Sequence, residues 1–182
     1  MSLRTGIYTI ANQKAPLVLD LADGNSANNT RILGWPENIA DSGIPFLNQL
    51  WLVRKISGSN VYSLQNLGGG TYMDMSLDSG SDSDNGNVVY GRQANDGTAD
   101  QPSHKANQQW EIIAHNQFYK LRNVQGNTFL DLAAGGTSGG TIIQTWEAAS
   151  LNNVSNQLWT FKAHGEDQIQ TYEEASPYYA VK

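Results

Sequence analysis

"NQLW", at Asn48–Trp51, is the stretch that decides the fold, because the chain contains it more than once. The tetrapeptide returns unchanged at Asn156–Trp159, and a near-copy, "NQQW", stands between them at Asn107–Trp110. A tryptophan motif that recurs at long intervals is typical of a protein built from internal repeats. The segments that precede the three copies can therefore be aligned with one another.

Three further segments precede each copy, always in the same order. The first segments are "GIYTI" (Gly6–Ile10), "NVYSL" (Asn60–Leu64) and "QFYKL" (Gln117–Leu121). The second are "LVLDL" (Leu17–Leu21), "TYMDM" (Thr71–Met75) and "TFLDL" (Thr128–Leu132). The third are "TRILGW" (Thr30–Trp35), "NVVYGR" (Asn87–Arg92) and "TIIQTW" (Thr141–Trp146). Each short apolar run predicts a strand, so the sequence predicts three units of four strands.

The all-β prediction also follows from the 18 glycines and the many Asn, Asp and Ser residues between these runs. Propellers typically need at least four blades, and an open solenoid needs capping repeats. Three units that close on themselves leave few strand edges exposed, which predicts a β-trefoil. We expect the trefoil over residues 1–163, with repeats at about 4–55, 56–115 and 116–163, followed by an acidic C-terminal tail at 164–182.

Composition excludes several classes of function. The net charge of −6 and the pI near 4.9 argue against a nucleic-acid surface, and no apolar run is long enough to insert in a membrane. The chain has no cysteine and no segment resembling a signal peptide, which favours a cytoplasmic location. The acids of Asp78–Gly86 miss the alternating pattern of a calcium loop, so we expect neither a metal nor a cofactor.

The five tryptophans fall into two groups. Trp51, Trp110 and Trp159 belong to the repeated motif, and we expect them in the core, with each neighbouring Gln holding a loop. Trp35 and Trp146 each follow an Asp by 15 residues and end a strand. The second unit has Arg92 at this position, and alternation between Trp and Arg predicts a surface position.

An Asp, a Trp and an Asn on one surface have the chemistry that a sugar requires. A carboxylate accepts bonds from adjacent hydroxyls, and an amide adds a donor and an acceptor. A flat indole covers the C–H face of a pyranose such as galactose. We therefore expect Asp20 and Asp131 to face solvent, although an Asp in a turn is as often structural.

Three QxW repeats, each with an Asp near the end of its second strand, resemble the ricin-B-type lectins. "SLRTGIYTI", "VLDLADGNS", "ILGW" and "NQLWLV" most resemble the β-trefoil lectins of mushrooms such as Macrolepiota and Clitocybe, and the lectin module of the Marasmius agglutinin. The resemblance covers about residues 4–163. It implies a non-catalytic lectin that binds galactose, N-acetylgalactosamine or N-acetyllactosamine on glycoproteins or glycolipids, with a role in fungal defence. It leaves open whether the chain forms a homodimer.

The resemblance also assigns carbohydrate-binding residues by position. In the first unit these are Asp20, Trp35 and Asn48, with Asp23, Gly24 and Asn38 in the adjacent loops. In the third unit they are Asp131, Trp146 and Asn156, with Gln144 and Gln157. The first unit departs from the ricin pattern because Leu33 stands where the third has Gln144. The second unit keeps its Asp and Asn, but Arg92 replaces the ring, so we expect no binding there.

Two other functions stay open at this stage. The same fold serves protease inhibitors, which act through one exposed loop, and a trefoil can also be a scaffold with vestigial sites. An inhibitor would not need Asp and Trp paired at equal spacing in two units. An enzyme is not expected, because a glycosidase needs two carboxylates across one bond, whereas each unit here supplies one.

Overall fold

The computed structural model describes residues 3–38, 46–56, 60–78, 81–94, 105–149 and 154–165, which form twelve β-strands and no α-helix. The first unit contains β1 (Gly6–Asn12), β2 (Val18–Leu21), β3 (Thr30–Trp35) and β4 (Trp51–Lys55). The second contains β5 (Val61–Asn66), β6 (Tyr72–Met75), β7 (Asn87–Arg92) and β8 (Trp110–His115). The third contains β9 (Phe118–Asn123), β10 (Phe129–Leu132), β11 (Thr141–Trp146) and β12 (Trp159–His164). None of these described segments is a helix able to cross a membrane.

Six strands close into an antiparallel barrel. β1 pairs with β12 and β4, β5 pairs with β4 and β8, and β9 pairs with β8 and β12. The first and last of the described strands are therefore neighbours, and the barrel that these six strands form has no open edge. Closure of this kind satisfies the backbone groups that an edge strand would expose.

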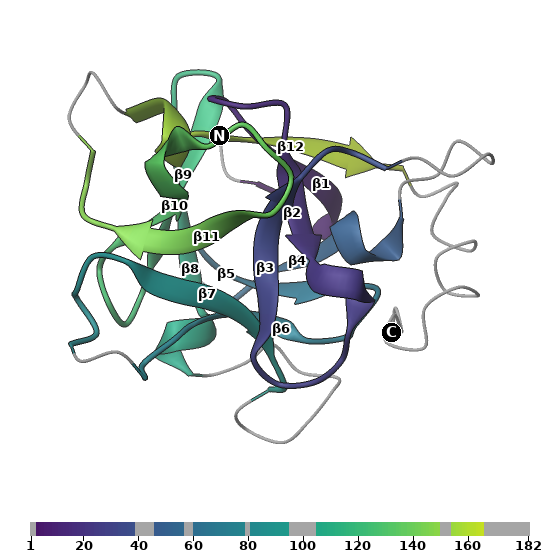
Figure 1. Ribbon diagram of the computed structural model, residues 1–182, viewed down its shortest axis with the longest axis horizontal. Coiled ribbons are helices and arrows are strands. Elements are labelled where there is room, and N and C mark those ends of the chain that lie inside the picture. The colour runs from purple at the N-terminus through teal and green to yellow at the C-terminus, as the bar shows by residue number, and fades with distance from the viewer. Residues whose placement is uncertain are drawn as a thin grey trace.

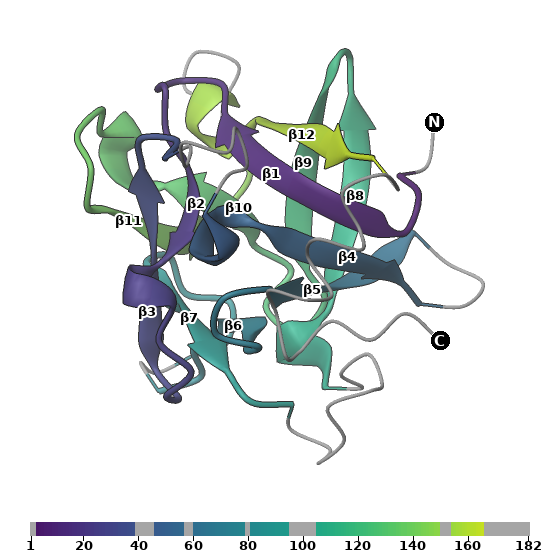
Figure 2. The ribbon, with the colours of Figure 1, turned by 90° about the vertical axis from the view of Figure 1, so that its right-hand side faces the viewer.

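The other six strands form three hairpins, β2–β3, β6–β7 and β10–β11, which cover one end of the barrel. Their outer strands also pair with one another, since β11 pairs with β3 and β7, and β3 pairs with β7. In Figure 1, β3, β7 and β11 lie next to one another. Figure 2 shows these strands on the left and the barrel strands β1, β4, β8 and β12 on the right. The predicted β-trefoil is confirmed.

The three motif tryptophans fill the core where the barrel meets the hairpins. Trp51, Trp110 and Trp159 are 0%, 0% and 1% exposed. Each indole N–H donates to the carbonyl that precedes the Asp of its unit, at 3.0, 2.9 and 3.1 Å. Each ring thus ties a barrel strand to a hairpin, and the predicted core position is confirmed.

The Asn-Gln pair before each tryptophan lies in a short 3₁₀ turn: η2 (Leu47–Gln49), η3 (Ala106–Gln108) and η5 (Val154–Gln157). The glutamines are fully buried and hold the loop that follows the third strand of their unit. Gln49 donates to the carbonyl of Pro36 at 2.9 Å and accepts from the N–H of Asn38 at 2.8 Å. Gln157 makes the equivalent pair of bonds to the loop after β11. The prediction that each Gln holds a loop is confirmed.

The last strand marks the end of the described trefoil. β12 ends at His164, one residue past the predicted domain boundary at 163. The predicted tail at 164–182 lies outside the described residues from 166 onward.

Candidate functional site

One aspartate lies near the end of the second strand in each unit, and all three are buried. Asp20, Asp74 and Asp131 are 5%, 0% and 3% exposed. The expectation that Asp20 and Asp131 simply face solvent is therefore wrong. Each carboxylate is sunk beneath the hairpin surface, because the Asn and Gln of the repeated motif reach over to it.

Asp20 uses only one of its two oxygens for this internal bonding. Asn48 Nδ2 and Gln49 Nε2 both donate to Oδ2, at 3.0 and 2.8 Å. Within the described residues, Oδ1 has no hydrogen-bond partner. It is also not among the side-chain atoms there that are both buried and unpaired, so it reaches the surface. One carboxylate oxygen of a largely buried residue is thus left to accept a hydrogen bond from a ligand.

Asp131 has a similar arrangement with one added neighbour. Asn156 Nδ2 donates to Oδ2 at 2.8 Å, and Gln144 Nε2 donates to Oδ1 at a longer 3.3 Å. Gln144 lies directly opposite Asp131 in the β10–β11 register, as Leu33 lies opposite Asp20 in β2–β3. The third unit therefore places an amide where the first places an apolar side chain.

Burial changes the acidity of both carboxyls. Burial is the main cause that raises the pKa of Asp20 above 3.8, and it is opposed by the bonds from Gln49 and Asn48. The charge of Asp23 adds to the increase. Burial likewise raises the pKa of Asp131, against the bond from Gln144. Desolvation disfavours the charged form, and among the described residues no cation contributes to the shift of either carboxyl.

An exposed indole accompanies each of these two carboxylates. Trp35 and Trp146 are 40% and 39% exposed, which confirms the predicted surface position. Each stands two residues after the partner of its Asp, on the same outward face of the hairpin. Such diagonal neighbours lie about 7–8 Å apart in a sheet. We call the group of Asp20, Trp35 and Asn48 site one, and the group of Asp131, Trp146 and Asn156 site three.

A turn from another unit supports each ring. A Cβ atom on Gly139, which precedes β11, would lie 3.3 Å from Cδ2 of Trp35. A Cβ on Gly86, which precedes β7, would lie 3.8 Å from Cζ3 of Trp146. The indole of site one therefore packs against a turn of the third unit, and the indole of site three packs against a turn of the second. Alignment of the repeats could not reveal these neighbours, because it does not say which unit lies next to which.

The remaining predicted residues surround these two sites. Asp23 and Gly24 lie in the 3₁₀ turn η1 (Ala22–Gly24), and a Cβ on Gly24 would lie 3.5 Å from Cβ of Asn48. Asn38 is half-buried and is held by Gln49. Gln157 is fully buried and its amide is bonded to the loop, so we propose that it positions site three without touching a ligand.

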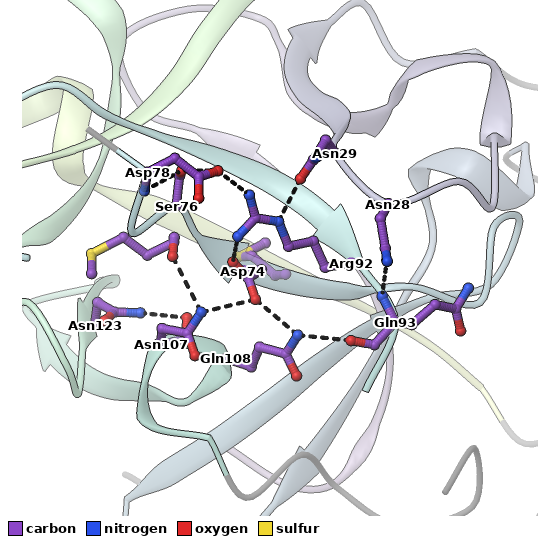
Figure 3. A network of polar contacts seen from close by, with 12 residues as sticks. Asn28, Asn29, Asp74, Ser76, Asp78, Arg92, Gln93, Asn107, Gln108 and Asn123 are labelled. Atoms are coloured by element: carbon purple, nitrogen blue, oxygen red, sulfur yellow. Dashed lines mark hydrogen bonds and ion pairs between the residues drawn. The ribbon is translucent and has the colours of Figure 1, made fainter. Parts of the chain in front are cut away.

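In the second unit, the side chain of Arg92 occupies the position that is equivalent to sites one and three. Arg92 donates to Asp74 Oδ1 at 3.3 Å, to Asp78 Oδ2 at 2.5 Å and to Asn29 Oδ1 at 2.6 Å. Figure 3 shows its guanidinium between these three groups. Asn107 and Gln108 occupy Asp74 Oδ2, at 2.9 and 2.8 Å. The carboxylate that is open in site one thus has both oxygens occupied here.

Comparisons with known proteins agree with this architecture. Residues 47–146 and 106–180 match the family model "Ricin-type beta-trefoil lectin domain-like". The Rhizoctonia solani agglutinin is 25% identical, with a TM-score of 0.69 over 90% of this chain and 99% of that one. A Polyporus squamosus lectin is 26% identical, with a TM-score of 0.66 over 90% of this chain but only 50% of that one.

The Macrolepiota procera ricin B-like lectin shares the fold, with 21% identity and a TM-score of 0.64 over 90% of this chain and 99% of that one. No curated protein sequence is significantly similar to the chain. The two ranges matched by the family model together run from residue 47 to residue 180, well over half of the 182 residues. The chain therefore belongs to the ricin-type β-trefoil lectin-like family.

Proposed function

We propose that this carbohydrate-binding lectin holds the terminal galactose, N-acetylgalactosamine or N-acetyllactosamine of a glycan at sites one and three. The observation that carries this function is the carboxylate of Asp20, which is 5% exposed yet keeps Oδ1 unpaired within the described residues. Because this oxygen reaches the surface, it can accept a charge-assisted hydrogen bond from a sugar hydroxyl. Trp35 stands on the same face, where its ring can cover the apolar side of a pyranose.

Several further facts support this choice of ligand. The Polyporus lectin was solved with a glycan that contains galactose, and the Macrolepiota lectin was solved with lactose. A non-catalytic role fits site three, where a single carboxylate meets the ligand, because glycoside hydrolysis uses two. The rival function, protease inhibition through a loop, would leave the paired Asp and Trp of two units without a purpose. The defence role stays a prediction, which a feeding assay with the purified protein tests.

Conservative variants of the two carboxylates test the function. In Asp20→Asn, the amide oxygen takes the bonds from Asn48 and Gln49, so the NH₂ group replaces Oδ1 and turns an acceptor into a donor. A lost charge-assisted bond is worth about 1.5–3 kcal/mol. A shallow sugar site has a Kd of order 0.1–1 mM, so lactose binding at site one should become undetectable by calorimetry.

Asp131→Asn should remove site three in the same way, and the double variant should bind no lactose. Asp74→Asn is the matched control, because Arg92 already occupies that carboxylate and both sites should keep their affinity. Melting temperatures show whether each variant folds. Wild-type lactose affinity in a folded double variant would refute the site assignment. Inhibition of a protease by the same protein would favour the rival function.

As the pH is lowered, lactose binding should weaken at a higher pH than that at which exposed aspartates become protonated. Burial raises the pKa of Asp20 and of Asp131 above 3.8, so these carboxyls take up protons at a higher pH than exposed ones. A protonated carboxyl loses its charge-assisted bonds to sugar hydroxyls. Lactose affinity, measured by titration from neutral pH downward, should therefore fall as the pH passes through the raised pKa values.

The same protonation should not unfold the protein. A raised pKa in the folded state means that the folded form binds these two protons more tightly than the unfolded chain does. The stability from the two groups is fully present below the unfolded pKa and is lost as the pH rises through the folded one. Melting temperatures recorded at each pH separate the two effects. Loss of binding only at the pH of unfolding would contradict the prediction.

A further inference from the structure

A turn with the same backbone conformation follows the carboxylate in site one and in site three, but the side chains on the two turns differ. Asp23 and Gly24 in η1 have φ angles of 55° and 61°, and Ala134 and Gly135 in η4 (Ala133–Gly135) have 52° and 62°. The two turns are thus superimposable in conformation. Site one gains a second carboxylate at this point, whereas site three has a methyl group.

The segment that lies against each turn also differs. A Cβ on Gly24 would have the backbone of Gly68 as a neighbour at 3.9 Å, and Gly68 has no side chain. A Cβ on Gly135 would instead lie 3.2 Å from Cγ and 3.4 Å from Cε of Lys14. The exposed side chain of Lys14 therefore runs along the turn of site three. Its backbone is fixed by a 2.8 Å bond from its N–H to Asn12 Oδ1.

Neither of these charges is neutralised by a partner. In the described ranges, Asp23 has no ion pair or hydrogen bond through its carboxylate, and the Lys14 ammonium has none either. Asp23 is close enough to Asp20 for its charge to help raise the pKa of that carboxyl. The ligand at site one thus meets two negative charges, and the ligand at site three meets one negative and one positive charge.

We infer that the two sites sort galactose-type glycans by charge: site one selects neutral or amine-bearing glycans, and site three accepts those that carry an added anionic group. This inference rests on the proposed function of both sites. The anionic group is a carboxylate, as on a sialic acid, or a sulfate, because both have the charge that Lys14 attracts and Asp23 repels. Asp23 and Lys14 are then the residues that determine specificity.

Single-site proteins separate the two specificities. Asp131→Asn retains site one, and Asp20→Asn retains site three. Each is titrated calorimetrically with lactose, a sulfated lactose and a sialylated lactose, at low and at high ionic strength. Exposed charge pairs change affinity by about two- to fivefold each. Both anionic probes should bind site one two- to fivefold more weakly than lactose, and site three at least as tightly as lactose. High salt should reduce both differences, because it screens the charges.

Exchanging the side chains of Asp23 and Ala134, the equivalent residues of the two turns, provides matched variants. Asp23→Ala, made in the protein that retains site one, should remove its discrimination against both anionic probes. Ala134→Asp, made in the protein that retains site three, should create that discrimination, and Lys14→Gln should weaken the binding of anionic probes relative to lactose. The backbone accepts the exchange because Ala134 and Asp23 already adopt the same left-handed conformation.

Three results would overturn the inference. Equal ratios of anionic to neutral affinity at the two sites would do so while leaving the proposed function intact. If the two sites differed in their affinity for the sialylated probe but not for the sulfated one, they would discriminate by the size of the added group and not by its charge. Failure of both single-site proteins to bind any probe, with folding intact, would overturn the inference and the proposed function together.

Discussion

Replacing Trp51 with alanine should lower the free energy of unfolding by about 3–5 kcal/mol, the cost of removing a large aromatic side chain from a core. The indole is 0% exposed and fills the junction between the barrel and the first hairpin. The substitution also leaves the carbonyl of Leu19 without the indole N–H that it accepts at 3.0 Å. Urea unfolding followed by circular dichroism measures the loss.

Trp35→Ala is the control for this experiment, because it removes the same side chain from a position that is 40% exposed. Little stability should be lost, whereas lactose binding at site one should disappear with the ring that covers the sugar. The two tryptophans thus separate folding from binding. If Trp35→Ala unfolds the chain and Trp51→Ala does not, the roles of the two rings are reversed.

Asp74→Ala should also lower the free energy of unfolding, by about 1–3 kcal/mol for each buried donor that loses its acceptor and by more for the charged group of Arg92. The variant leaves Arg92 facing an empty space beside Asp78, and the side-chain amides of Asn107 and Gln108 lose their common acceptor. Unpaired buried donors add to the loss. Lactose affinity should not change, because we propose no sugar site in the second unit.

Two further variants test why Asp74→Ala lowers the free energy of unfolding. Asp20→Ala removes an equally buried carboxylate that has no arginine partner, so its cost should be smaller, about 1–2 kcal/mol. In the double variant Asp74→Ala/Arg92→Ala, part of the stability should return, because the arginine no longer lies opposite an unfilled site. Equal losses for Asp74→Ala and Asp20→Ala, measured by urea unfolding, would mean that the ion pair contributes nothing.

Much of the fold could be predicted because apolar residues alternate cleanly in this sequence. The strands expected at Thr30–Trp35, Asn87–Arg92 and Thr141–Trp146 have those same bounds in the structure. The division of the tryptophans into core and surface also followed from position alone. Repetition supplied both results, because the motif tryptophan is kept in all three units, whereas Arg92 takes the place of Trp35 and Trp146 in the second unit.

The environment of the aspartates could not be predicted in the same way. From the sequence, Asp20 could be either a structural residue or a ligand-binding one. In the structure, its Oδ2 has the structural role, because it accepts from Asn48 and Gln49, and its Oδ1 is left for a ligand. Burial depends on Gln49, which is distant in sequence and whose side-chain direction no pattern specifies. Contacts between units, such as that of Arg92 with Asn29, depend on how the barrel closes, which periodicity does not encode.

The support of each indole by a turn from another unit has a practical consequence. Trp35 lies against Gly139 and Trp146 against Gly86, so each sugar platform needs two units, and both platforms are complete only when all three units have met around the barrel. A chain in which one unit is missing or not yet folded would lack at least one finished platform. Retention on a galactose resin would then be strongest for molecules that present both platforms, and a single affinity step would enrich correctly closed molecules over partly assembled forms.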